Sequence, residues 1–363
     1  MPRGVLIAAG GTGGHLFPAQ ALAAALAERG VPVDLATDER ALKYGGDFPA
    51  RTIHRIPSAT PTGAGLASKA GAALVLARGV ALSWVRLRQI APLAVIGFGG
   101  YPTVPPLLAA TLLKLPTLLH EQNAVMGRAN RFLASWVRVI ATGFPTLKDA
   151  QGAIAAKARY TGNPVRPAVI AAAAIPYPDF ADGRLRVLIT GGSQGARVMS
   201  EIAPAAIALL SGADRARLHL TQQARGEDKQ NVAAACARMN FPVELAEFFA
   251  DLPARIAASH LVIGRAGAST VSELAVIGRP SILVPFPHAL DQDQAANAAI
   301  LADVGAAQVV PQSAFTPERL AGLLRNALAD PASLASAARA AKAVGAPDAA
   351  GRLADLVREC AGL

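Results

Sequence analysis

Short apolar runs alternate with longer stretches of helical periodicity along most of the chain. The first run, Val5–Ala8, ends in glycines and is followed by a helical pattern over 18–29 and a second apolar run over 31–35. Similar runs predict strands at 94–96, 117–120, 139–141, 186–189, 218–220, 243–246, 261–263 and 281–284. Buried strands that alternate with helices indicate parallel sheets covered on both faces. The pattern therefore predicts an α/β fold with doubly wound sheets.

One strand, loop and helix pattern occurs twice, half a chain apart. VLIAAGGTGG at 5–14 resembles VLITGGSQGA at 187–196, and in both a buried strand runs into glycines before a helix. A chain of 363 residues is long enough for two domains that each bury a core. We expect two Rossmann-like domains, 1–163 and 164–363, divided where prolines cluster between Gly162 and Gly183. The helical pattern at 349–360 could belong to either domain.

One uncharged apolar stretch, 91–113, raises the question of a membrane span. Its prolines and glycines would break a lipid-exposed helix, so a strand, a glycine loop and a helix are the better interpretation. No signal peptide is visible, because the apolar start is short and runs into glycines. Cys236 and Cys360 suggest no disulfide framework, and a reducing, cytosolic setting fits them.

The positive charge is confined to the first half of the chain. Residues 1–163 hold 17 Lys and Arg against 7 Asp and Glu, which accounts for the whole net charge of +10. The interval between Asp47 and Glu121 has no acid but has Arg51, Arg55, Lys69, Arg78, Arg86, Arg88 and Lys114. A one-sided field suggests an anionic partner, either nucleic acid or an acidic membrane surface. Charge that only favours solubility is the alternative.

Each glycine loop could bind phosphate. Without side chains, backbone N–H groups at a helix start can approach a phosphate, and the helix dipole favours its negative charge. Tight strand-to-helix turns also use glycine, so two loops in matching positions are better evidence than one. A dehydrogenase fingerprint is half met, because Asp34 could bind ribose but Leu16 occupies the third glycine position. Neither loop ends in the Gly-Lys-Ser/Thr of a Walker A loop.

Polar residues beside these loops are candidates for chemistry. The dipole at a helix start should lower the pKa of His15 and leave a neutral imidazole that can accept a proton; a helix cap is the alternative. HEQN at 120–123 follows a strand end, where ligands bind in open α/β sheets. Thr270 and Glu273 have capping-box spacing, yet Glu273 could equally accept hydrogen bonds from ribose hydroxyls. DQD at 291–293 resembles a DxD metal motif, although acids also favour helix starts.

Together these segments resemble the MurG family of N-acetylglucosamine transferases. The resemblance runs in family order over most of the chain, through GGTGGHLFPA (10–19), GFGGYPTVP (97–105), HEQNAVMGRAN (120–130), TGNPVRP (161–167), GGSQGAR (191–197), EFFADLP (247–253), RAGASTVSELAVIGRPSILVPFPHALDQDQAANA (265–298) and VGA (304–306). It implies a GT-B fold, with two Rossmann-like domains whose parallel sheets face a central cleft. In that fold the last helix usually crosses back to the N-terminal domain.

The resemblance also implies how the donor, UDP-GlcNAc, would bind to the C-terminal domain. The 191–196 loop with Ser193 would hold the diphosphate, and Glu273 would bind the ribose. Phe249, where the family often has isoleucine, would offer its backbone to the uracil, and Gln294 would bond the sugar. The expected donor-binding residues are Thr12, Gly13, Gly14, Asn123, Arg166, Ser193, Phe249, Ala268, Ser269, Thr270, Val271, Ser272, Glu273 and Gln294.

The acceptor that the resemblance implies is lipid I, undecaprenyl-pyrophosphoryl-MurNAc-pentapeptide, and the N-terminal domain would bind it. Its C4 hydroxyl would displace UDP with inversion, giving lipid II for peptidoglycan synthesis, and His15 would be the general base. The candidate acceptor-side residues are Gly11, Gly99, Gly100 and Tyr101. Enzymes of this kind generally work without a DxD-bound metal, so we expect neither a metal site nor a cofactor.

Because lipid I stays in the bilayer, the resemblance implies a peripheral enzyme at the cytoplasmic face of the bacterial inner membrane. The apolar pattern over 66–87, with Trp84, Arg78, Arg86 and Arg88, is a candidate docking surface for an anionic membrane. A core-facing helix with solvated arginines is the alternative. The sequence identifies no protein partner.

Four other functions are alternatives to this assignment. Another GT-B lipid glycosyltransferase and a UDP-GlcNAc epimerase-like protein would share the fold. A nicotinamide-dependent oxidoreductase is disfavoured by Leu16. A nucleic-acid-binding protein is suggested by charge alone, and the basic interval 47–121 has few aromatic residues and no recognised motif, so we expect no nucleic-acid partner.

Overall fold

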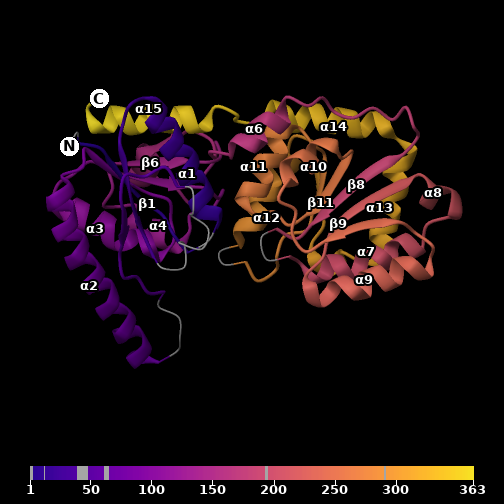
Figure 1. The fold of residues 1–363 in the computed structure, drawn as a ribbon, viewed down its shortest axis with the longest axis horizontal. Coiled ribbons are helices and arrows are strands. Elements are labelled where there is room, and N and C mark those ends of the chain that lie inside the picture. The colour runs from indigo at the N-terminus through magenta and orange to yellow at the C-terminus, as the bar shows by residue number, and fades with distance from the viewer. Residues whose placement is uncertain (1–2, 12, 39–47, 61–64, 193–194, 290–291) are drawn as a thin grey trace. The chain divides into compact units, whose positions relative to one another are not determined.

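The computed structural model describes residues 3–11, 13–38, 48–60, 65–192, 195–289 and 292–363 (Figure 1). The chain divides into two compact units. The first comprises Met1–Arg166 together with Ala346–Leu363, and the second comprises Pro167–Gly345. The C-terminal helix therefore belongs to the unit that contains the N-terminus.

A seven-stranded parallel sheet in the order β3-β2-β1-β4-β5-β6-β7 forms the centre of the first unit. Its strands are β1 (Val5–Ala8), β2 (Val33–Thr37), β3 (Ile53–Arg55), β4 (Ala94–Gly97), β5 (Thr117–Glu121), β6 (Val139–Thr142) and β7 (Ala158–Tyr160). Its helices are α1 (Gly13–Glu28), α2 (Leu66–Ile90), α3 (Val104–Leu112), α4 (Arg128–Leu133), α5 (Gly152–Lys157) and α15 (Ala349–Ala361).

The second unit has a six-stranded parallel sheet in the order β10-β9-β8-β11-β12-β13. Its strands are β8 (Leu185–Thr190), β9 (Leu218–Gln223), β10 (Val243–Ala246), β11 (Leu261–Gly264), β12 (Ser281–Leu283) and β13 (Ala307–Val309). Its helices are α6 (Pro167–Ala173), α7 (Arg197–Ala208), α8 (Gly212–Ala216), α9 (Gly226–Arg238), α10 (Leu252–Ala258), α11 (Ala268–Ile277), α12 (Asp293–Ala302), α13 (Pro317–Ala329) and α14 (Pro331–Ala343). The predicted α/β architecture with doubly wound parallel sheets is confirmed.

Strand β1 shows why the sequences of the central strands are continuous apolar runs. Val5 and Ile7 pack into a core with side chains of α1 and α15, whereas Leu6 and Ala8 pack into a second core with α2, α3 and α4. Successive side chains of a strand point to opposite faces of the sheet. Both faces are covered by helices, so every position of β1 is buried.

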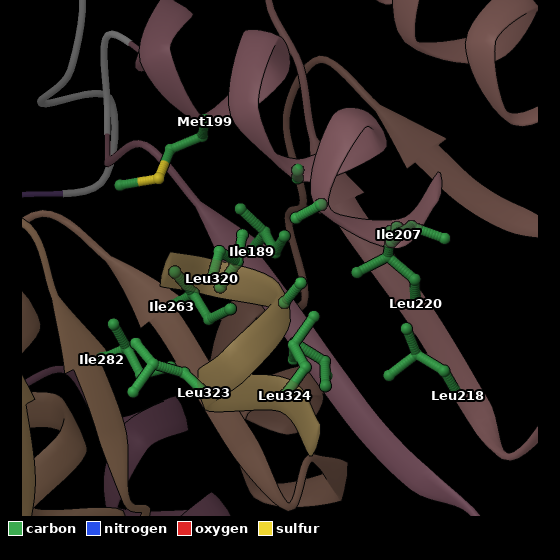
Figure 2. Packing of buried hydrophobic residues seen from close by; sticks show 14 of the residues in the cluster. Ile189, Met199, Ile207, Leu218, Leu220, Ile263, Ile282, Leu320, Leu323 and Leu324 are labelled. Atoms are coloured by element: carbon green, nitrogen blue, oxygen red, sulfur yellow. The ribbon is translucent and has the colours of Figure 1, made fainter. Parts of the chain in front are cut away.

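Helix α15 covers one face of the first sheet beside α1 (Figure 1). It buries Leu353, Ala354 and Val357, while Arg29, the residue after α1, pairs with Asp355 at 2.9 Å. In the second unit, too, helices pack against the sheet to form a core. Figure 2 shows Ile189 and Ile263 from the central strands packed against Leu320, Leu323 and Leu324 of α13.

Each sheet has one place where the strand order reverses. In the first sheet β1 lies beside β4, and in the second β8 lies beside β11. Ligands of open α/β sheets bind outside the carboxyl ends of the strands at such a switch point. The loops after β1, β4, β8 and β11 therefore define the candidate sites, and both repeated glycine loops are among them.

The stretch 91–113 contains β4, the 3-10 turn Tyr101–Thr103 and α3, as the sequence predicts. A different segment, Ser68–Ile90 within α2, is the one helix among the described residues that is long and apolar enough to cross a membrane by length and composition. Only 22% of its most apolar window is buried.

Candidate functional site

The switch point of the first unit surrounds the imidazole of His15. His15 is the third residue of α1 and is partly buried. Gly99 and Gly100, after β4, have φ angles of +87° and +72°. A Cβ atom on Gly99 would lie 3.3 Å from His15 Cε1, and one on Gly100 would lie 3.4 Å from His15 Cδ2. Both positions therefore require glycine, because their φ angles are positive and because a side chain there would contact the His15 ring.

The protonation of His15 is set by burial and by one glutamine. His15 Nδ1 lies 3.3 Å from Gln122 Oε1. Burial lowers the pKa of His15 below 6.5, although the hydrogen bonds to Gln122 and to the Phe98 backbone oppose this effect. At neutral pH the imidazole is uncharged and has one nitrogen lone pair available to accept a proton.

The segment after β5 is organised around the buried carboxylate of Glu121. Its oxygens accept hydrogen bonds from Asn123 N at 2.9 Å, Gly127 N at 3.0 Å and Asn130 Nδ2 at 2.8 Å. Asn123 Nδ2 donates a further bond at 3.2 Å. Burial raises the pKa of Glu121, and these donors lower it again. Glu121 thereby fixes the backbone and amide of Asn123, an expected donor-binding residue.

In the first glycine loop, the N–H of Gly11 donates a hydrogen bond to a carboxylate of the chain itself. Asp38, which follows β2 and is buried, accepts a hydrogen bond from Gly11 N at 3.1 Å. A Cβ atom on Gly10 would lie 2.8 Å from Asp38 Oδ1. The N–H of Gly11 is therefore engaged by a negative group, which also disfavours a phosphate at the same place. We had expected acceptor-side contacts at Gly11, and its N–H cannot supply them while this bond is made.

The other expected residues of the first unit are placed as follows. Gly13 is the buried first residue of α1, and Gly14 is exposed. Tyr101 begins the 3-10 turn and packs against the core beneath α3. The guanidinium of Arg166 lies 5.2 Å from the ring centre of Phe17, two residues after His15 on α1. Thr12 lies outside the described residues.

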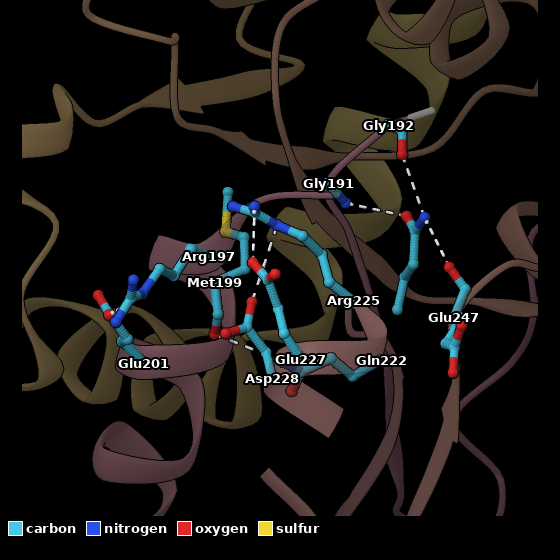
Figure 3. A network of polar contacts seen from close by, with 11 residues as sticks. Gly191, Gly192, Arg197, Met199, Glu201, Gln222, Arg225, Glu227, Asp228 and Glu247 are labelled. Atoms are coloured by element: carbon cyan, nitrogen blue, oxygen red, sulfur yellow. Dashed lines mark hydrogen bonds and ion pairs between the residues drawn. The ribbon is translucent and has the colours of Figure 1, made fainter. Parts of the chain in front are cut away.

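The switch point of the second unit holds its glycine loop with neutral groups. Gln223, at the end of β9, accepts hydrogen bonds from Gly191 N at 3.1 Å and Thr190 Oγ1 at 2.8 Å. Its Nε2 donates to Gly192 O at 3.1 Å and to Glu247 O at 3.2 Å. Gln223 thus joins the predicted diphosphate loop to the segment that leads to Phe249, and the dashed lines at Gly191, Gly192 and Glu247 in Figure 3 mark these contacts. Ser193 lies outside the described residues.

An arginine lies against the same loop. A Cβ atom on Gly195 would lie 2.7 Å from Arg225 Cγ, so Arg225 covers this end of the loop. Figure 3 shows its guanidinium directed to Glu227 and Asp228, at 3.1 and 3.7 Å. Gln223 and Arg225 did not enter the sequence prediction. Their position in TQQAR, directly at the end of a predicted strand, was the available signal.

Ala268 to Glu273 form the first six residues of α11. Gly267 is the N-cap, so the capping-box interpretation of Thr270 and Glu273 is wrong: both are already inside the helix. Ala268, Val271, Ser272 and Glu273 are buried, while Ser269 and Thr270 are partly exposed. The backbone N–H groups at the start of this helix lie just after the carboxyl end of β11.

Of the remaining donor-side residues, Phe249 follows β10 and Gln294 is the second residue of α12. The ring of Phe249 is buried under the guanidinium of Arg255 at 4.3 Å, so only its backbone could face a ligand. Gln294 Oε1 accepts hydrogen bonds from Phe286 N at 2.9 Å and Ala266 N at 3.3 Å. A ligand would therefore meet Gln294 through its NH2 group. Asp291 lies outside the described residues, and Asp293 accepts a bond from Gln294 N.

Comparisons with known proteins agree over the whole length. The glycosyltransferase family 28 N-terminal domain model matches residues 5–142, and the glycosyltransferase family 28 C-terminal domain model matches residues 186–353. A UDP-N-acetylglucosamine–N-acetylmuramyl-(pentapeptide) pyrophosphoryl-undecaprenol N-acetylglucosamine transferase of Methylorubrum extorquens is 58% identical over 98% of this chain and 97% of its own. The protein of the same name from Methylobacterium nodulans is also 58% identical, over 98% of this chain and 96% of its own.

One solved structure resembles the chain over nearly all of its residues. The crystal structure of Acinetobacter baumannii MurG has a TM-score of 0.81 and 30% sequence identity, and the match covers 99% of this chain and 100% of that one.

Proposed function

The chain belongs to glycosyltransferase family 28, and we propose that it transfers N-acetylglucosamine from UDP-GlcNAc to the C4 hydroxyl of the muramyl unit of lipid I, which yields lipid II. The names of the relatives state this donor sugar and this lipid-linked acceptor, and the similarity covers 98% of the chain. The observation that carries the proposal is the chemical difference between the two switch points. One presents a neutral imidazole and a glycine loop whose Gly11 N–H is bonded by a carboxylate, and the other presents a glycine loop held by a neutral amide.

The donor belongs, in this proposal, to the second unit. A diphosphate is favoured at the 191–196 loop because α7 begins there and its dipole attracts negative charge. The first loop is disfavoured because Asp38 already occupies Gly11. Glu273 would accept hydrogen bonds from the ribose, Phe249 would offer its backbone to the uracil, and Gln294 would donate its NH2 group to the sugar.

The reaction we propose is a direct displacement with inversion at the anomeric carbon. His15 removes the proton of the C4 hydroxyl while that oxygen bonds to the anomeric carbon and UDP departs with the bonding electrons. The departing diphosphate gains negative charge, which loop N–H groups and Arg166 would stabilise. Gly99 and Gly100 leave the His15 ring accessible on the side where a side chain would cover it.

Helix α2 is the surface through which we propose that the enzyme reaches its lipid acceptor. Leu74, Arg78, Val85 and Arg88 fall on one exposed face, because their spacings of four, seven and three residues return to the same side of a helix. The opposite face is packed: a Cβ atom on Gly79 would lie 2.3 Å from Pro57 O. A helix fixed along one side in this way lies on an anionic membrane surface rather than across it.

Trp84, which we had expected on this surface, packs partly against the core instead. The exposed apolar residues of α2 are Leu74 at 73%, Val85 at 50% and Val75 at 36% exposure. In this proposal the enzyme is peripheral, at the cytoplasmic face of the bacterial inner membrane, where lipid I presents its sugar.

The decisive experiment is product analysis. The full-length protein is incubated with UDP-GlcNAc labelled in the sugar and with a lipid I analogue, and the product is identified together with its anomeric configuration. We expect a β-linked GlcNAc-MurNAc disaccharide that appears only when both substrates are present. Free GlcNAc, an epimerised UDP-sugar or an α-linkage would each contradict the proposal.

A further inference from the structure

A line of hydrogen bonds runs from His15 into the interior of the first unit. His15 Nδ1 lies 3.3 Å from Gln122 Oε1, and Gln122 Nε2 lies 3.1 Å from His120 Nδ1. His120 Nε2 in turn lies 3.1 Å from the backbone oxygen of Gly162. Gln122 and His120 are both buried, so solvent does not compete for these contacts.

The chemical identity of the neighbours fixes the direction of every bond in this line. Gln122 Nε2 lies 2.9 Å from Phe98 O and 3.1 Å from His120 O. Carbonyl oxygens only accept hydrogen bonds, so the atom facing them must be the NH2 group of Gln122. The other end of the amide, Oε1, then faces His15 and can only accept. His15 Nδ1 must therefore carry the hydrogen.

The far end of the line agrees with this direction. Because Gly162 O only accepts, His120 Nε2 carries a hydrogen and His120 Nδ1 can only accept. The two hydrogens of the Gln122 NH2 group are then shared among His120 Nδ1, Phe98 O and His120 O. Burial lowers the pKa of His120 to about 4, so this imidazole stays neutral at the pH of the cell and the direction does not reverse.

We propose that Gln122 is a positioning residue that holds His15 in the Nδ1–H tautomer and thereby presents the Nε2 lone pair for catalysis. The proposal rests on the assignment of His15 as the base. Nε2 lies beside Gly100, because a Cβ atom on that residue would be 3.5 Å from Nε2. Since glycine has no side chain, residue 100 does not cover Nε2. Nε2 then takes the proton of the acceptor hydroxyl, and the imidazolium that forms keeps its Nδ1–H bond to Gln122.

Histidine side-chain ¹⁵N shifts measure the tautomer directly. The full-length protein is labelled with ¹⁵N-histidine at a pH of about 7.5, and a His15→Gln variant identifies the His15 signals among those of the six histidines. In the unsubstituted protein we expect a protonated Nδ1 and an unprotonated Nε2 for His15. A dominant Nε2–H form would overturn the proposal before any variant is tested.

Gln122→Met removes the acceptor while it keeps a side chain of similar length. We expect the Nδ1–H form of His15 to lose its dominance and kcat to fall about tenfold, the size of one hydrogen bond's net contribution. The KM for UDP-GlcNAc should change by less than about twofold. Gln122→Glu restores an acceptor oxygen opposite Nδ1, so Nδ1 should again be protonated, but the carboxylate raises the pKa of His15 and should move the acidic limb of activity to higher pH. An unchanged tautomer in Gln122→Met, or a changed tautomer with an unchanged kcat, would refute the positioning role.

Gln222→Met is the matched control, because Gln222 is as deeply buried but lies in β9 of the second unit. It should leave the ¹⁵N shifts of His15 unchanged. The tautomer measurement needs no substrate, so it stands apart from the proposed function. If the unsubstituted protein forms no disaccharide, the proposed function fails while the tautomer result is still decided.

Discussion

The chemistry assigned to His15 depends on neighbours that contribute no net charge. A glutamine amide bonds one ring nitrogen, and two glycines lie against the ring. Burial then becomes the main influence on the pKa of His15 and lowers it. A carboxylate in the place of Gln122 would instead have favoured the protonated form, which cannot act as a base.

The pH dependence of turnover should report this lowered pKa. As the pH falls through the pKa of His15, the imidazole is protonated and kcat/KM, which reports the free enzyme, falls, so its acidic limb should have its midpoint below 6.5. Replacement of His15 by Ala should lower kcat by roughly 10²–10⁴-fold. UDP affinity, measured by calorimetry, should change by less than about twofold. A variant with nearly normal kcat would show that another group is the base.

Gly191 allows a second test at the same scale. A Cβ atom there would lie 2.1 Å from Ala196 N, a separation that forces the backbone of the loop to move. Gly191→Ala should therefore raise the Kd for UDP by more than about tenfold, since loop N–H groups would lose their alignment with the diphosphate. Gly212→Ala is the control, because its Cβ would meet no atom within 4 Å. Equal UDP affinity in the two variants would count against the diphosphate assignment.

Several residues of the site could not be found from the sequence, because their partners are distant along the chain. The sequence drew attention to His15 and to HEQN at 120–123 by composition and by their position after predicted elements. It could not show that Gln122 bonds His15, or that Asp38 bonds Gly11. The capping-box interpretation failed because helix α11 begins after Gly267, so Thr270 lies one turn too late to cap it.

At the scale of elements, the central strands and the edge strand β10 were predictable, whereas the edge strands β3, β7 and β13 were not. Both faces of β1, β4, β8 and β11 are covered, which produces uninterrupted apolar runs. β3, β7 and β13 have three residues each and are partly exposed, so they lack such a run and were not predicted. Helix α1 begins at Gly13, five residues before the predicted start. Its first turn contains two glycines, which have a low helix propensity, so the sequence did not predict a helix there.

Helix α2 gives the element-scale prediction. Replacement of Arg78, Arg86 and Arg88 by Gln should weaken binding to vesicles that contain anionic lipid, by about 1 kcal/mol for each charge that approaches the surface. The effect should shrink as salt is added. Arg184, Arg215 and Arg238 of the second unit, replaced together by Gln, form the control with the same change in net charge. Co-sedimentation that does not depend on anionic lipid or on α2 would contradict electrostatic docking by this helix.

At the scale of the whole molecule, the two units share one topology but differ in charge and in the chemistry of their switch points. The excess of basic residues lies in residues 1–163 and accounts for the net charge of +10. The duplication was visible in the sequence because each half kept its first strand and glycine loop. What each loop can bind depends on its contact with Asp38, which follows β2, or with Gln223 at the end of β9. These partners are distant along the chain from the loops, so no short sequence motif reveals them.

The number of bound nucleotides is the whole-molecule prediction. Because Asp38 engages the first loop, titration of the full-length chain with UDP should give one bound nucleotide per chain. Asp38→Asn would remove the repulsion, so any weak second binding should appear in this variant alone. Two equivalent sites in the unsubstituted protein, measured by calorimetry, would contradict the prediction.

The Asp38 carboxylate thus acts as an internal competitor with a local concentration that no free metabolite can match. A loop of this type would otherwise be open to any nucleotide in its surroundings, including the UDP that the reaction releases. Because Gly11 N is bonded to Asp38, this loop is disfavoured as a second site for released UDP. Under the proposed assignment of donor and acceptor units, the contact would protect the acceptor unit from inhibition by the product of the donor unit.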